Sequence, residues 1–473
     1  MRACCHSGPF RAAPGRPKFG CLRPVTAVPW PDGQQSADRH GSQRRWAGGR
    51  APLGVVGRRG PRHHRGRTPL WDRAVARGFL RPHLDPGLEF RRLVFEPGRM
   101  LGAFDPYDPT RCVATFRSFD TELTLPGGAL LPVDAITAVT VNTTHRRRGL
   151  LSEMMGRDLT AARERGSVAA ILIAAEYAIY GRYGFGPATR GQSWRIDLRR
   201  GTIRPDLRAA PGRTDFVTMA EARKLGAELH ERWRRTQPGA IGRNSAWWRL
   251  HTGDVTLPGY DWKEPFVALH RDESGTVTGL ISYRVDDVWD GPVPDCTLTV
   301  VDFLALDVPT AVALWRLAFS VDWVRTVVVE NTGPDDPLPL LLTDPRAATT
   351  GRDSSDFVWL RLLDLPAAFA ARRYRAAGRL VLDVADRAGH AAGRWLLETA
   401  ADGSGRCTAL DAAADEPADL ALDVSALGSL YLGAESAVRL AAAGLVSELR
   451  PGAVQEADLV LRTAVQAWNP DGF

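Results

Sequence analysis

Apolar and polar positions begin to alternate regularly near Trp71, and from there to about residue 175 they describe one α/β unit. A tight Pro126-Gly127-Gly128 turn between two alternating runs predicts a β-hairpin. Apolar residues four positions apart, such as Leu151 and Met155, predict the helix after the hairpin. The predicted elements are a helix at 71–80, strands at 99–103, 112–125 and 129–141, a helix at 149–165 and a strand at 168–175.

Two further segments follow, and the second keeps the order of elements of the first without a residue-level repeat. Its predicted elements are a helix at 220–235, strands at 265–270, 277–285 and 296–305, a helix at 311–321 and a strand at 326–330. The third segment is predicted to hold a helix at 366–372, strands at 380–384 and 394–399, and helices at 424–432 and 434–443. The expected fold class is therefore α/β (α+β) with mixed sheets in several domains.

The net charge of +7 is concentrated at the N-terminus, where residues 1–70 hold 14 basic and 2 acidic side chains. Because that surplus exceeds the net charge, the rest of the chain is mildly acidic and gives no case for a nucleic-acid partner. Residues 1–68 are rich in Arg, Gly and Pro, a composition compatible with a nucleic-acid arm, a transit peptide or a twin-arginine signal. We favour a disordered tail or a misassigned start, since hydrophobic periodicity is absent there.

Six cysteines without a CxxC pair indicate neither a zinc site nor a disulfide framework, so we expect no metal. No stretch reaches 18 consecutive apolar residues, and no membrane span is expected. A reducing, cytoplasmic location fits this cysteine usage best.

The most informative stretch is 139–152, where a strand passes through a short basic turn into the start of a helix. The unpaired N–H groups of a helix start carry partial positive charge and bind anions. Gly149 lets a pyrophosphate approach the backbone, and the arginines at 146–148 add charge-assisted hydrogen bonds. On these residues alone two interpretations stay open: a diphosphate site, and a solvated basic turn that caps a helix.

The turn Arg146-x-x-Gly149 after a Val-x-Val strand resembles the acetyl-CoA pyrophosphate loop of the GNAT superfamily, although many members have Gly or Ala where this chain has Leu151. The longer string HRRRGLL at 145–151 resembles a narrower group, the enhanced intracellular survival (Eis) family of acetyltransferases. Three further strings carry the same resemblance: IYGRYGFGPAT at 179–189, ERWR at 231–234 and LGSLYLGA at 427–434.

This resemblance implies two GNAT folds in tandem and a sterol-carrier-like domain, assembled as a homohexamer, with only the first GNAT unit catalytic. The implied divisions of this chain are a tail at 1–68, a catalytic GNAT domain at 71–210, a second GNAT-like domain at 211–355 and a sterol-carrier-like domain at 356–473.

The resemblance also implies acetyl-CoA as the co-substrate. The backbone of 139–141 would pair with the pantetheine arm, the basic turn and helix start would hold the pyrophosphate, and two residues after the next strand would border the cofactor. The implied cofactor-binding residues are Val139, Thr140, Val141, Arg146, Arg147, Arg148, Gly149, Leu150, Leu151, Ser152, Ala175 and Glu176.

Transfer of an acetyl group from a thioester to a primary amine needs a base for the amine and an acid for the thiolate. The resemblance implies Tyr180 as the acid, and a phenol with a pKa near 10 suits that role. It implies the α-carboxylate of Phe473 as the base, acting directly or through a water. The alternatives are a packed turn tyrosine and a frayed chain end.

The acceptor amine is the least defined part of the site. Phe90 is the expected aromatic of the substrate pocket, and Asp471 is the acid nearest the chain end, whereas 79–83 holds none. Aminoglycosides, polyamines and lysine side chains all stay open as substrates. The first GNAT strand, expected just before Trp71, is not recognisable. A rival interpretation is an inert GNAT scaffold whose C-terminal domain carries a lipid or sterol.

Overall fold

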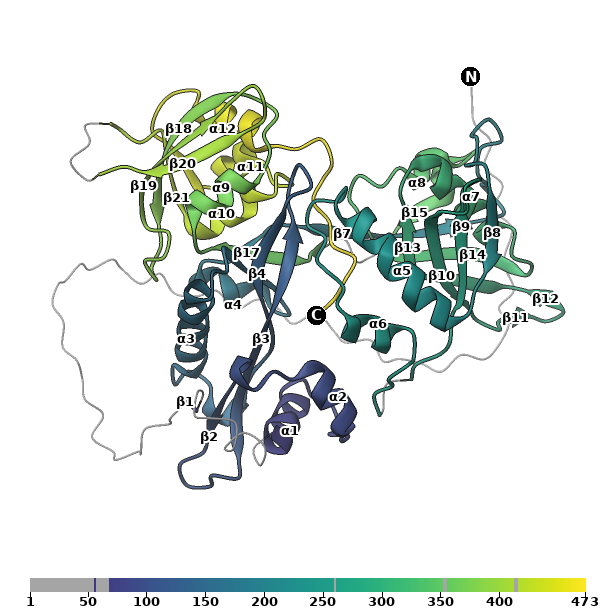
Figure 1. Cartoon of the computed structure of the whole chain (residues 1–473), viewed down its shortest axis with the longest axis horizontal. Coiled ribbons are helices and arrows are strands. Elements are labelled where there is room, and N and C mark those ends of the chain that lie inside the picture. The colour runs from purple at the N-terminus through teal and green to yellow at the C-terminus, as the bar shows by residue number, and fades with distance from the viewer. Residues whose placement is uncertain (1–54, 57–67, 259–260, 352–354, 412–415) are drawn as a thin grey trace, which may run out of the picture. The chain divides into compact units, whose positions relative to one another are not determined.

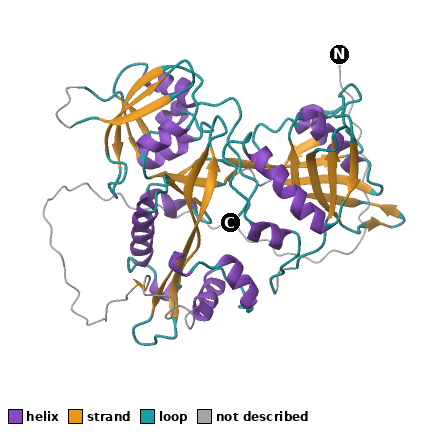
Figure 2. Ribbon diagram, in the orientation of Figure 1, coloured by secondary structure: helices purple, strands orange, loops and turns teal. Residues whose placement is uncertain are grey.

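The computed structural model describes residues 55–56, 68–258, 261–351, 355–411 and 416–473. The predicted tail at 1–68 therefore lies outside the described residues, apart from Val55, Val56 and Thr68. Three larger sheets, of seven, eight and five strands, carry the helices around them (Figures 1 and 2). A two-stranded ribbon of β11 (Trp289–Asp290) and β12 (Val293–Pro294) completes the β-structure of the described residues.

The seven-stranded sheet has the order β1-β2-β3-β4-β5-β17-β6, and β4 and β5 are its parallel pair. The Pro126–Gly128 turn joins β3 to β4 as an antiparallel hairpin, as predicted. The strands are β1 (Val55–Val56), β2 (Met100–Phe104), β3 (Cys112–Thr124), β4 (Leu130–Val141), β5 (Ala169–Ile173), β17 (Val358–Leu362) and β6 (Gly186–Pro187).

The side chains of β3 alternate between two differently covered faces of this sheet. Ser118 donates to Asp158 of α3 (Leu150–Glu164), with 2.7 Å between Oγ and Oδ1, so one face is covered by α3. Arg117 donates from Nη1 to the Val94 carbonyl at 2.8 Å, so the other face is covered by α2 (Gly87–Val94). The sequence did not predict α2, which lies beside α1 (Thr68–Gly78) near the chain start.

The eight-stranded sheet has the order β15-β7-β14-β13-β10-β9-β8, with β16 added beside β7, and its β13 and β14 are again a parallel pair. Helices α5 (Met219–Arg234), α6 (Ser245–His251), α7 (Val308–Phe319) and α8 (Leu338–Leu341) accompany it. The strands are β7 (Arg190–Asp197), β8 (Arg213–Phe216), β9 (Phe266–Arg271), β10 (Val277–Val285), β13 (Cys296–Ala305), β14 (Val324–Thr332), β15 (Ala348–Thr350) and β16 (Ser355–Asp356).

The five-stranded sheet, of order β20-β19-β18-β21-β22, belongs to the last part of the chain. Helix α10 (Val424–Tyr431) of this part packs on the first sheet at close range, because a Cβ on Gly428 would lie 2.3 Å from the Leu360 carbonyl oxygen of β17. The strands of the five-stranded sheet are β18 (Gly378–Ala385), β19 (Gly393–Thr399), β20 (Gly405–Ala409), β21 (Leu420–Asp423) and β22 (Val446–Glu448). Its helices are α9 (Leu365–Ala371), α10 (Val424–Tyr431), α11 (Ala437–Ala442) and α12 (Ala453–Leu461).

Strand pairing crosses the predicted divisions of the chain. β7 precedes residue 210 yet pairs with β14 of the second sheet, and β17 follows residue 355 yet pairs with β5 of the first. The divisions at 210 and 355 stay predictions. The strand expected just before Trp71 lies earlier, where Val55 and Val56 pair with Ala103 and Gly102 of β2. None of the helices in the described ranges is long and apolar enough to cross a membrane.

Candidate active site

Strands β4 and β5 separate at their carboxyl ends. They pair from Val133 to Ile136 on β4 and from Ala169 to Leu172 on β5, and pairing stops there although β4 continues to Val141. Ala138, at φ 52°, makes a bulge in β4 opposite β3, which adds to the divergence. The backbone of Val139, Thr140 and Val141 therefore has no strand partner on the β5 side, which fits an added extended ligand such as a pantetheine arm.

The basic turn after β4 presents its charges to solvent. The side chains of Arg146, Arg147 and Arg148 are exposed, whereas His145 is buried. His145 shares a hydrogen bond with the Thr144 hydroxyl, with 2.8 Å between Nδ1 and Oγ1. His145 Nε2 also lies 3.7 Å from Asp105 Oδ2. Burial lowers the pKa of His145, so it anchors the turn as a neutral group and leaves the arginines as the local cations.

Gly149 is the cap of α3 at φ 79°, a left-handed conformation that favours glycine, and no atom would meet a Cβ there within 4 Å. Leu150, Leu151 and Ser152 are the first residues of α3, where backbone N–H groups have no helical acceptor. The start of α3 is therefore an open site beside three exposed arginines, which is the arrangement a diphosphate requires.

The predicted acid Tyr180 ends a short helix, α4 (Tyr177–Tyr180), that follows β5. Its side chain is 8% exposed and meets Phe185 edge-on at 6.4 Å between ring centroids. Ala175 and Glu176, the predicted cofactor border, are exposed in the segment between β5 and α4. Ser152 of α3 and Tyr183, which follows Tyr180, come within 3.1 Å through their hydroxyl oxygens, so the turn and the helix start belong to one site.

Burial, together with smaller contributions from the nearby Glu176 and Tyr183, raises the pKa of Tyr180 to about 12. Tyr180 is therefore protonated at any pH near neutrality and is a hydrogen-bond donor. Its hydroxyl has no hydrogen-bond partner among the described residues, so the donor is available to a ligand.

The turn that carries Tyr180 is fixed from the third part of the chain. Arg361 of β17 donates to the Tyr183 carbonyl and forms a buried ion pair with Asp386, with 2.8 Å between Nη2 and Oδ1. Gly184, at φ 81°, leaves room for that guanidinium, since a Cβ would collide with it. No sequence motif pointed to Arg361.

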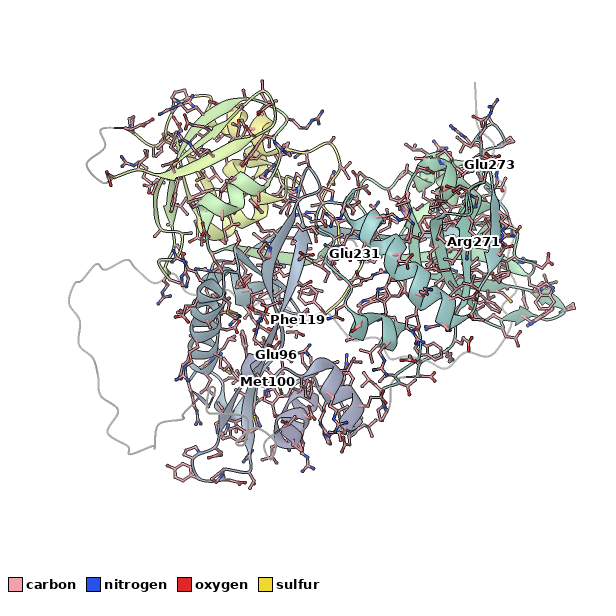
Figure 3. The ribbon with its side chains drawn as sticks, in the orientation of Figure 1. Glu96, Met100, Phe119, Glu231, Arg271 and Glu273 are labelled. Carbon is pink, nitrogen blue, oxygen red and sulfur yellow. The ribbon has the colours of Figure 1, made fainter. Side chains whose placement is uncertain are left out.

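The other face of β3 carries an aromatic cluster around Arg117. Its guanidinium carbon lies 5.9 Å from the ring centroid of Phe95 and 5.5 Å from that of Phe119, the ring labelled in Figure 3. The predicted pocket residue Phe90 joins the cluster through Phe95, with 5.8 Å between ring centroids. Among the described residues no carboxylate forms an ion pair with Arg117, and burial lowers its pKa to about 10.

The C-terminal residue reaches this same face. The Phe473 ring meets the Phe119 ring edge-on, with 5.9 Å between centroids. Phe473 and Tyr180 thus approach the first sheet through different strands, Phe473 at β3 and Tyr180 after β5. Asp471 is 4% exposed, and both of its carboxylate oxygens accept hydrogen bonds from Nε of Arg243, at 3.1 and 3.0 Å.

The second sheet has the same parallel pair but a different helix start after it. Asp307 caps α7 with its own carboxylate, which accepts from Thr310 N at 2.8 Å, and Pro309 contributes no N–H. A carboxylate therefore stands where the first unit has arginines and Gly149. That helix start does not suit a diphosphate.

Comparison with known proteins identifies both of these units and the last part of the chain. The description "Acetyltransferase (GNAT) domain" matches residues 67–188 and, through a second family model, residues 239–362. The description "Sterol carrier protein domain" matches residues 365–470.

Whole-chain relatives agree with these matches. An uncharacterised N-acetyltransferase of Streptomyces avermitilis is 49% identical over 412 residues, which covers 86% of this chain and 96% of the relative. The N-acetyltransferase Eis of Mycobacterium bovis is 38% identical over 336 residues, or 68% of this chain and 76% of that protein. The crystal structure of Eis1 from Mycobacterium abscessus superposes with a TM-score of 0.75 at 32% identity, covering 89% of this chain and all of Eis1. With two GNAT folds, a sterol-carrier-like domain and these relatives, the chain belongs to the Eis family of GNAT N-acetyltransferases.

Proposed function

We propose that the chain transfers the acetyl group of acetyl-CoA to a primary amine at the first sheet, with Tyr180 as the acid and the Phe473 α-carboxylate as the base. The observation that carries this proposal is the separation of β4 from β5 beyond Ile136 and Leu172, beside an open helix start with three exposed arginines. Acyl transfer itself follows from family membership; the residues and the acceptor are our proposal.

The residues proposed for acetyl-CoA suit its three parts. Val139, Thr140 and Val141 offer strand-like backbone groups to the amides of the pantetheine arm. The turn and the first residues of α3, with Arg146, Arg147, Arg148, Gly149, Leu150, Leu151 and Ser152, offer N–H groups and positive charge to the pyrophosphate. Ala175 and Glu176 border the site at the end of β5. This places the thioester near the residue that ends α4, Tyr180.

Tyr180 is proposed to stabilise the thiolate of coenzyme A as it leaves the acetyl group. With a pKa of about 12 against about 8.5 for an ordinary thiol, complete proton transfer to the thiolate is uphill by about 3.5 pKa units, or about 5 kcal/mol. Tyr180 therefore stabilises the departing thiolate chiefly as a hydrogen-bond donor, and the strength of that bond grows as negative charge develops on sulfur.

The Phe473 carboxylate is proposed to accept a proton from the nitrogen of the acceptor amine. A terminal carboxyl has an ordinary pKa of about 3.5, far below that of an alkylammonium group, so it cannot hold the ammonium proton; the acceptor loses that proton to water and attacks as the neutral amine. The N–H becomes acidic as nitrogen forms its bond to the acetyl carbon, and the carboxylate accepts the proton at that stage, directly or through a water. The contact of the Phe473 ring with Phe119 supports this by holding the chain end at the first sheet.

The acceptor is proposed to be a small primary amine with few charges in preference to a polycation. Phe90, Phe95 and Phe119 provide apolar contact area, but the cation next to them, Arg117, has no counter-ion among the described residues. Asp471, the acid expected to attract cations, is already engaged by Arg243. Aminoglycosides and polyamines would meet the uncompensated positive charge of Arg117 at this aromatic cluster.

The test is thiol release from acetyl-CoA with a panel of acceptors: a simple alkylamine, spermidine, an aminoglycoside and a lysine peptide. Three proteins are compared: the full chain, a chain lacking Phe473, and a chain with one alanine added after Phe473. The added residue keeps the aromatic ring and moves the carboxylate, so it separates the two contributions of the chain end.

Amine-dependent release by the full chain that falls at least about 100-fold in both altered chains supports the carboxylate role. Equal rates in all three proteins would exclude Phe473 as the base while leaving acyl transfer in place. Absence of release with every amine would favour the rival interpretation, in which the GNAT units are inert and the sterol-carrier-like domain is the functional part.

A further inference from the structure

The C-terminal segment, residues 466–473, lies against the second GNAT-like unit from Gln466 to Asp471. Gln466 N donates to Asp335 Oδ2 at 2.8 Å, and Trp468 N donates to the Pro238 carbonyl at 2.8 Å. The Trp468 ring meets Trp233 of α5 edge-on at 5.8 Å between ring centroids. These contacts hold an extended segment that has no regular secondary structure of its own.

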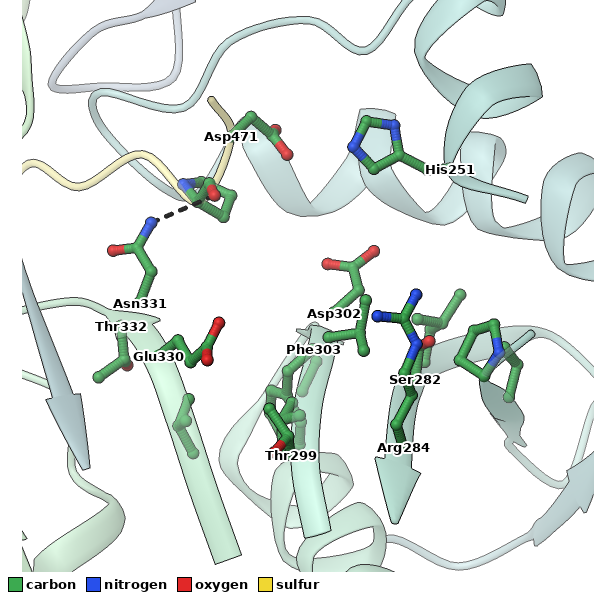
Figure 4. Close-up of a pocket in the computed structure, with 18 of the residues that line it drawn as sticks. His251, Ser282, Arg284, Thr299, Asp302, Phe303, Glu330, Asn331, Thr332 and Asp471 are labelled. Carbon is green, nitrogen blue, oxygen red and sulfur yellow. Dashed lines mark hydrogen bonds between the residues drawn. The ribbon is translucent and has the colours of Figure 1, made fainter. Parts of the chain in front are cut away.

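Asn331, at the end of β14, makes the most specific of these contacts. Its side-chain amide donates to the carbonyls of Asn469 and Pro470 at 3.0 and 3.2 Å, and its oxygen accepts from the Trp468 indole at 3.0 Å. One side chain therefore satisfies three groups of the segment, and Figure 4 draws Asn331 with one of these hydrogen bonds dashed. Because Asn469 and Pro470 present backbone carbonyls, an amide donor is required at this place.

Arg243 makes the second anchor and joins the segment to β13. Its guanidinium binds Asp471 at 3.0 Å and Asp302 of β13 at 2.7 Å, and it stacks on Trp247 at 3.9 Å from the ring centroid. Both carboxylates pull the pKa of Arg243 above its ordinary value, so the guanidinium stays charged. Asp471 therefore acts as the tether of the segment.

The two anchors lie at one place in the fold. β13 and β14 pair in parallel up to Val300 and Val329, and both Asp302 and Asn331 come after those residues. The segment thus crosses the carboxyl ends of the two parallel strands where they separate. It also walls a cavity of about 1230 Å³, together with residues of β10, β13 and β14 (Figure 4).

The corresponding place in the first sheet, beyond Ile136 and Leu172, is where we place the pantetheine arm. In the second sheet the C-terminal segment lies at the corresponding place, beyond Val300 of β13 and Val329 of β14. The start of α7 beside it is capped by Asp307. The second unit therefore keeps the open strand ends of a GNAT fold without the anion site that acetyl-CoA needs.

We infer that the second GNAT-like unit is the docking site of the chain's own C-terminal segment, with Asn331 and Arg243 as positioning residues that deliver Phe473 to Phe119. The docking itself stands on the contacts above; its consequence for catalysis rests on the proposed role of Phe473.

The test is trimming of the full-length chain by a carboxypeptidase that prefers aromatic C-termini, with loss of Phe473 followed by mass spectrometry. The variant is Asn331→Asp, which keeps the size of the side chain and the acceptor for Trp468 but replaces the amide donor by a carboxylate. Glu330→Gln is the control, because it makes the reverse exchange, carboxylate to amide, at the neighbouring, exposed position, which has no hydrogen-bond or ion-pair partner among the described residues.

Trimming tracks the undocked population when docking is fast. Loss of two donated hydrogen bonds raises that population on the order of ten- to thirtyfold, so trimming of Asn331→Asp is expected to accelerate by that factor. Glu330→Gln is expected to match the wild type within about twofold. Equal trimming of all three proteins would overturn the docking.

A second readout separates docking from catalysis. Acetyl transfer is measured on samples in which known fractions of the chain have lost Phe473. Activity that falls in proportion to the trimmed fraction, with an unchanged KM for acetyl-CoA, supports Phe473 as the group that docking delivers. Accelerated trimming without loss of activity would keep the docking and reject the proposed base, whereas unchanged trimming rejects the docking whatever the activity.

Discussion

The ring of Phe473, the last residue of the chain, meets the ring of Phe119 in the middle of β3 edge-on at 5.9 Å between centroids. The contact joins the chain end to a strand of the first sheet more than 350 residues earlier. Phe119 also lies under the Arg117 guanidinium, so one aromatic side chain connects the proposed base with an arginine that has no carboxylate partner among the described residues.

This contact predicts that Phe119→Ala lowers turnover. An edge-to-face aromatic pair contributes about 0.5–1.5 kcal/mol beyond area burial, so we expect kcat to fall roughly two- to tenfold. Phe119→Tyr should retain the contact and most of the activity. The measurement is kcat and KM for acetyl-CoA; a change in KM alone would contradict a role at the acceptor side.

Tyr180→Phe removes the proposed donor to sulfur without changing the ring. We expect kcat to fall about 100- to 1,000-fold while acetyl-CoA binding, measured by calorimetry, is unchanged. Because the pKa of Tyr180 is raised to about 12, its deprotonation should not shape the rate profile of the wild type between pH 6 and 10. An alkaline limb below pH 10 that disappears in Tyr180→Phe would contradict this assignment.

Gly149→Ala and Gly156→Ala form a matched pair on α3. Both positions have open space for a Cβ, but Gly149 has φ 79° and Gly156 lies inside the helix. Alanine at 156 is expected to stabilise the fold by about 1 kcal/mol and to leave the KM for acetyl-CoA unchanged.

Alanine at 149 strains the turn by about 1–2 kcal/mol and should raise the KM for acetyl-CoA roughly tenfold. The checks are thermal unfolding and steady-state kinetics. An unchanged KM in Gly149→Ala would argue against the start of α3 as the pyrophosphate site.

Arg117→Met should widen the acceptor range. Removing one uncompensated charge near the aromatic cluster lowers the repulsion of a polycation by about 1–2 kcal/mol, so the KM for spermidine is expected to fall roughly five- to thirtyfold. Arg117→Lys keeps the charge and should resemble the wild type. A KM for spermidine that rises in Arg117→Met would show that the guanidinium binds the acceptor.

His230 should make the fold sensitive to acid. Burial next to Arg243 and Arg234 lowers its pKa to about 2, whereas an unfolded histidine titrates near 6.5. Between those values the unfolded chain binds a proton that the folded chain does not, so stability rises with pH in this window and falls as pH drops below 6.5.

Neither ring nitrogen of His230 has a hydrogen-bond partner among the described residues, so His230→Leu breaks no hydrogen bond, although Nδ1 and Nε2 each lie 4.0 Å from a carboxylate oxygen, of Glu231 and Asp471 respectively. We expect the loss of thermal stability between pH 6.5 and 4.5 to be smaller in His230→Leu than in the wild type, by up to about 1.4 kcal/mol per pH unit. Parallel stability curves for the two proteins would refute the contribution of His230.

Local patterns were sufficient for much of the first sheet. The hairpin of β3 and β4 is marked by its glycine turn, and α3 by apolar residues four apart with a glycine before it. The fold class was confirmed because the order of strands and helices depends on such short-range signals. Helix α2 escaped prediction because its eight residues, GLEFRRLV, are too few to repeat a helical pattern and bury no side chain fully.

The site depends on pairings that a sequence pattern does not contain. The basic turn and Gly149 indicate an anion site from the local sequence alone. The contact between Ser152 of that site and Tyr183 is found only in the structure. By contrast, Arg243 needs two carboxylates from positions 302 and 471, and Asn331 needs carbonyls from 469 and 470. Such partners are set by the tertiary fold, so Asp471 looked like a free acid in the sequence.

Strand β17 has a consequence for synthesis of the chain. It covers β5, an entirely apolar strand of sequence AAILI, yet it is made about 185 residues later. At about 5–20 residues per second the ribosome needs roughly 10–40 s to cover that distance, and during this time one edge of β5 has no partner. The first sheet is therefore completed late in translation, and nascent chains halted before residue 358 should be the forms that chaperones retain.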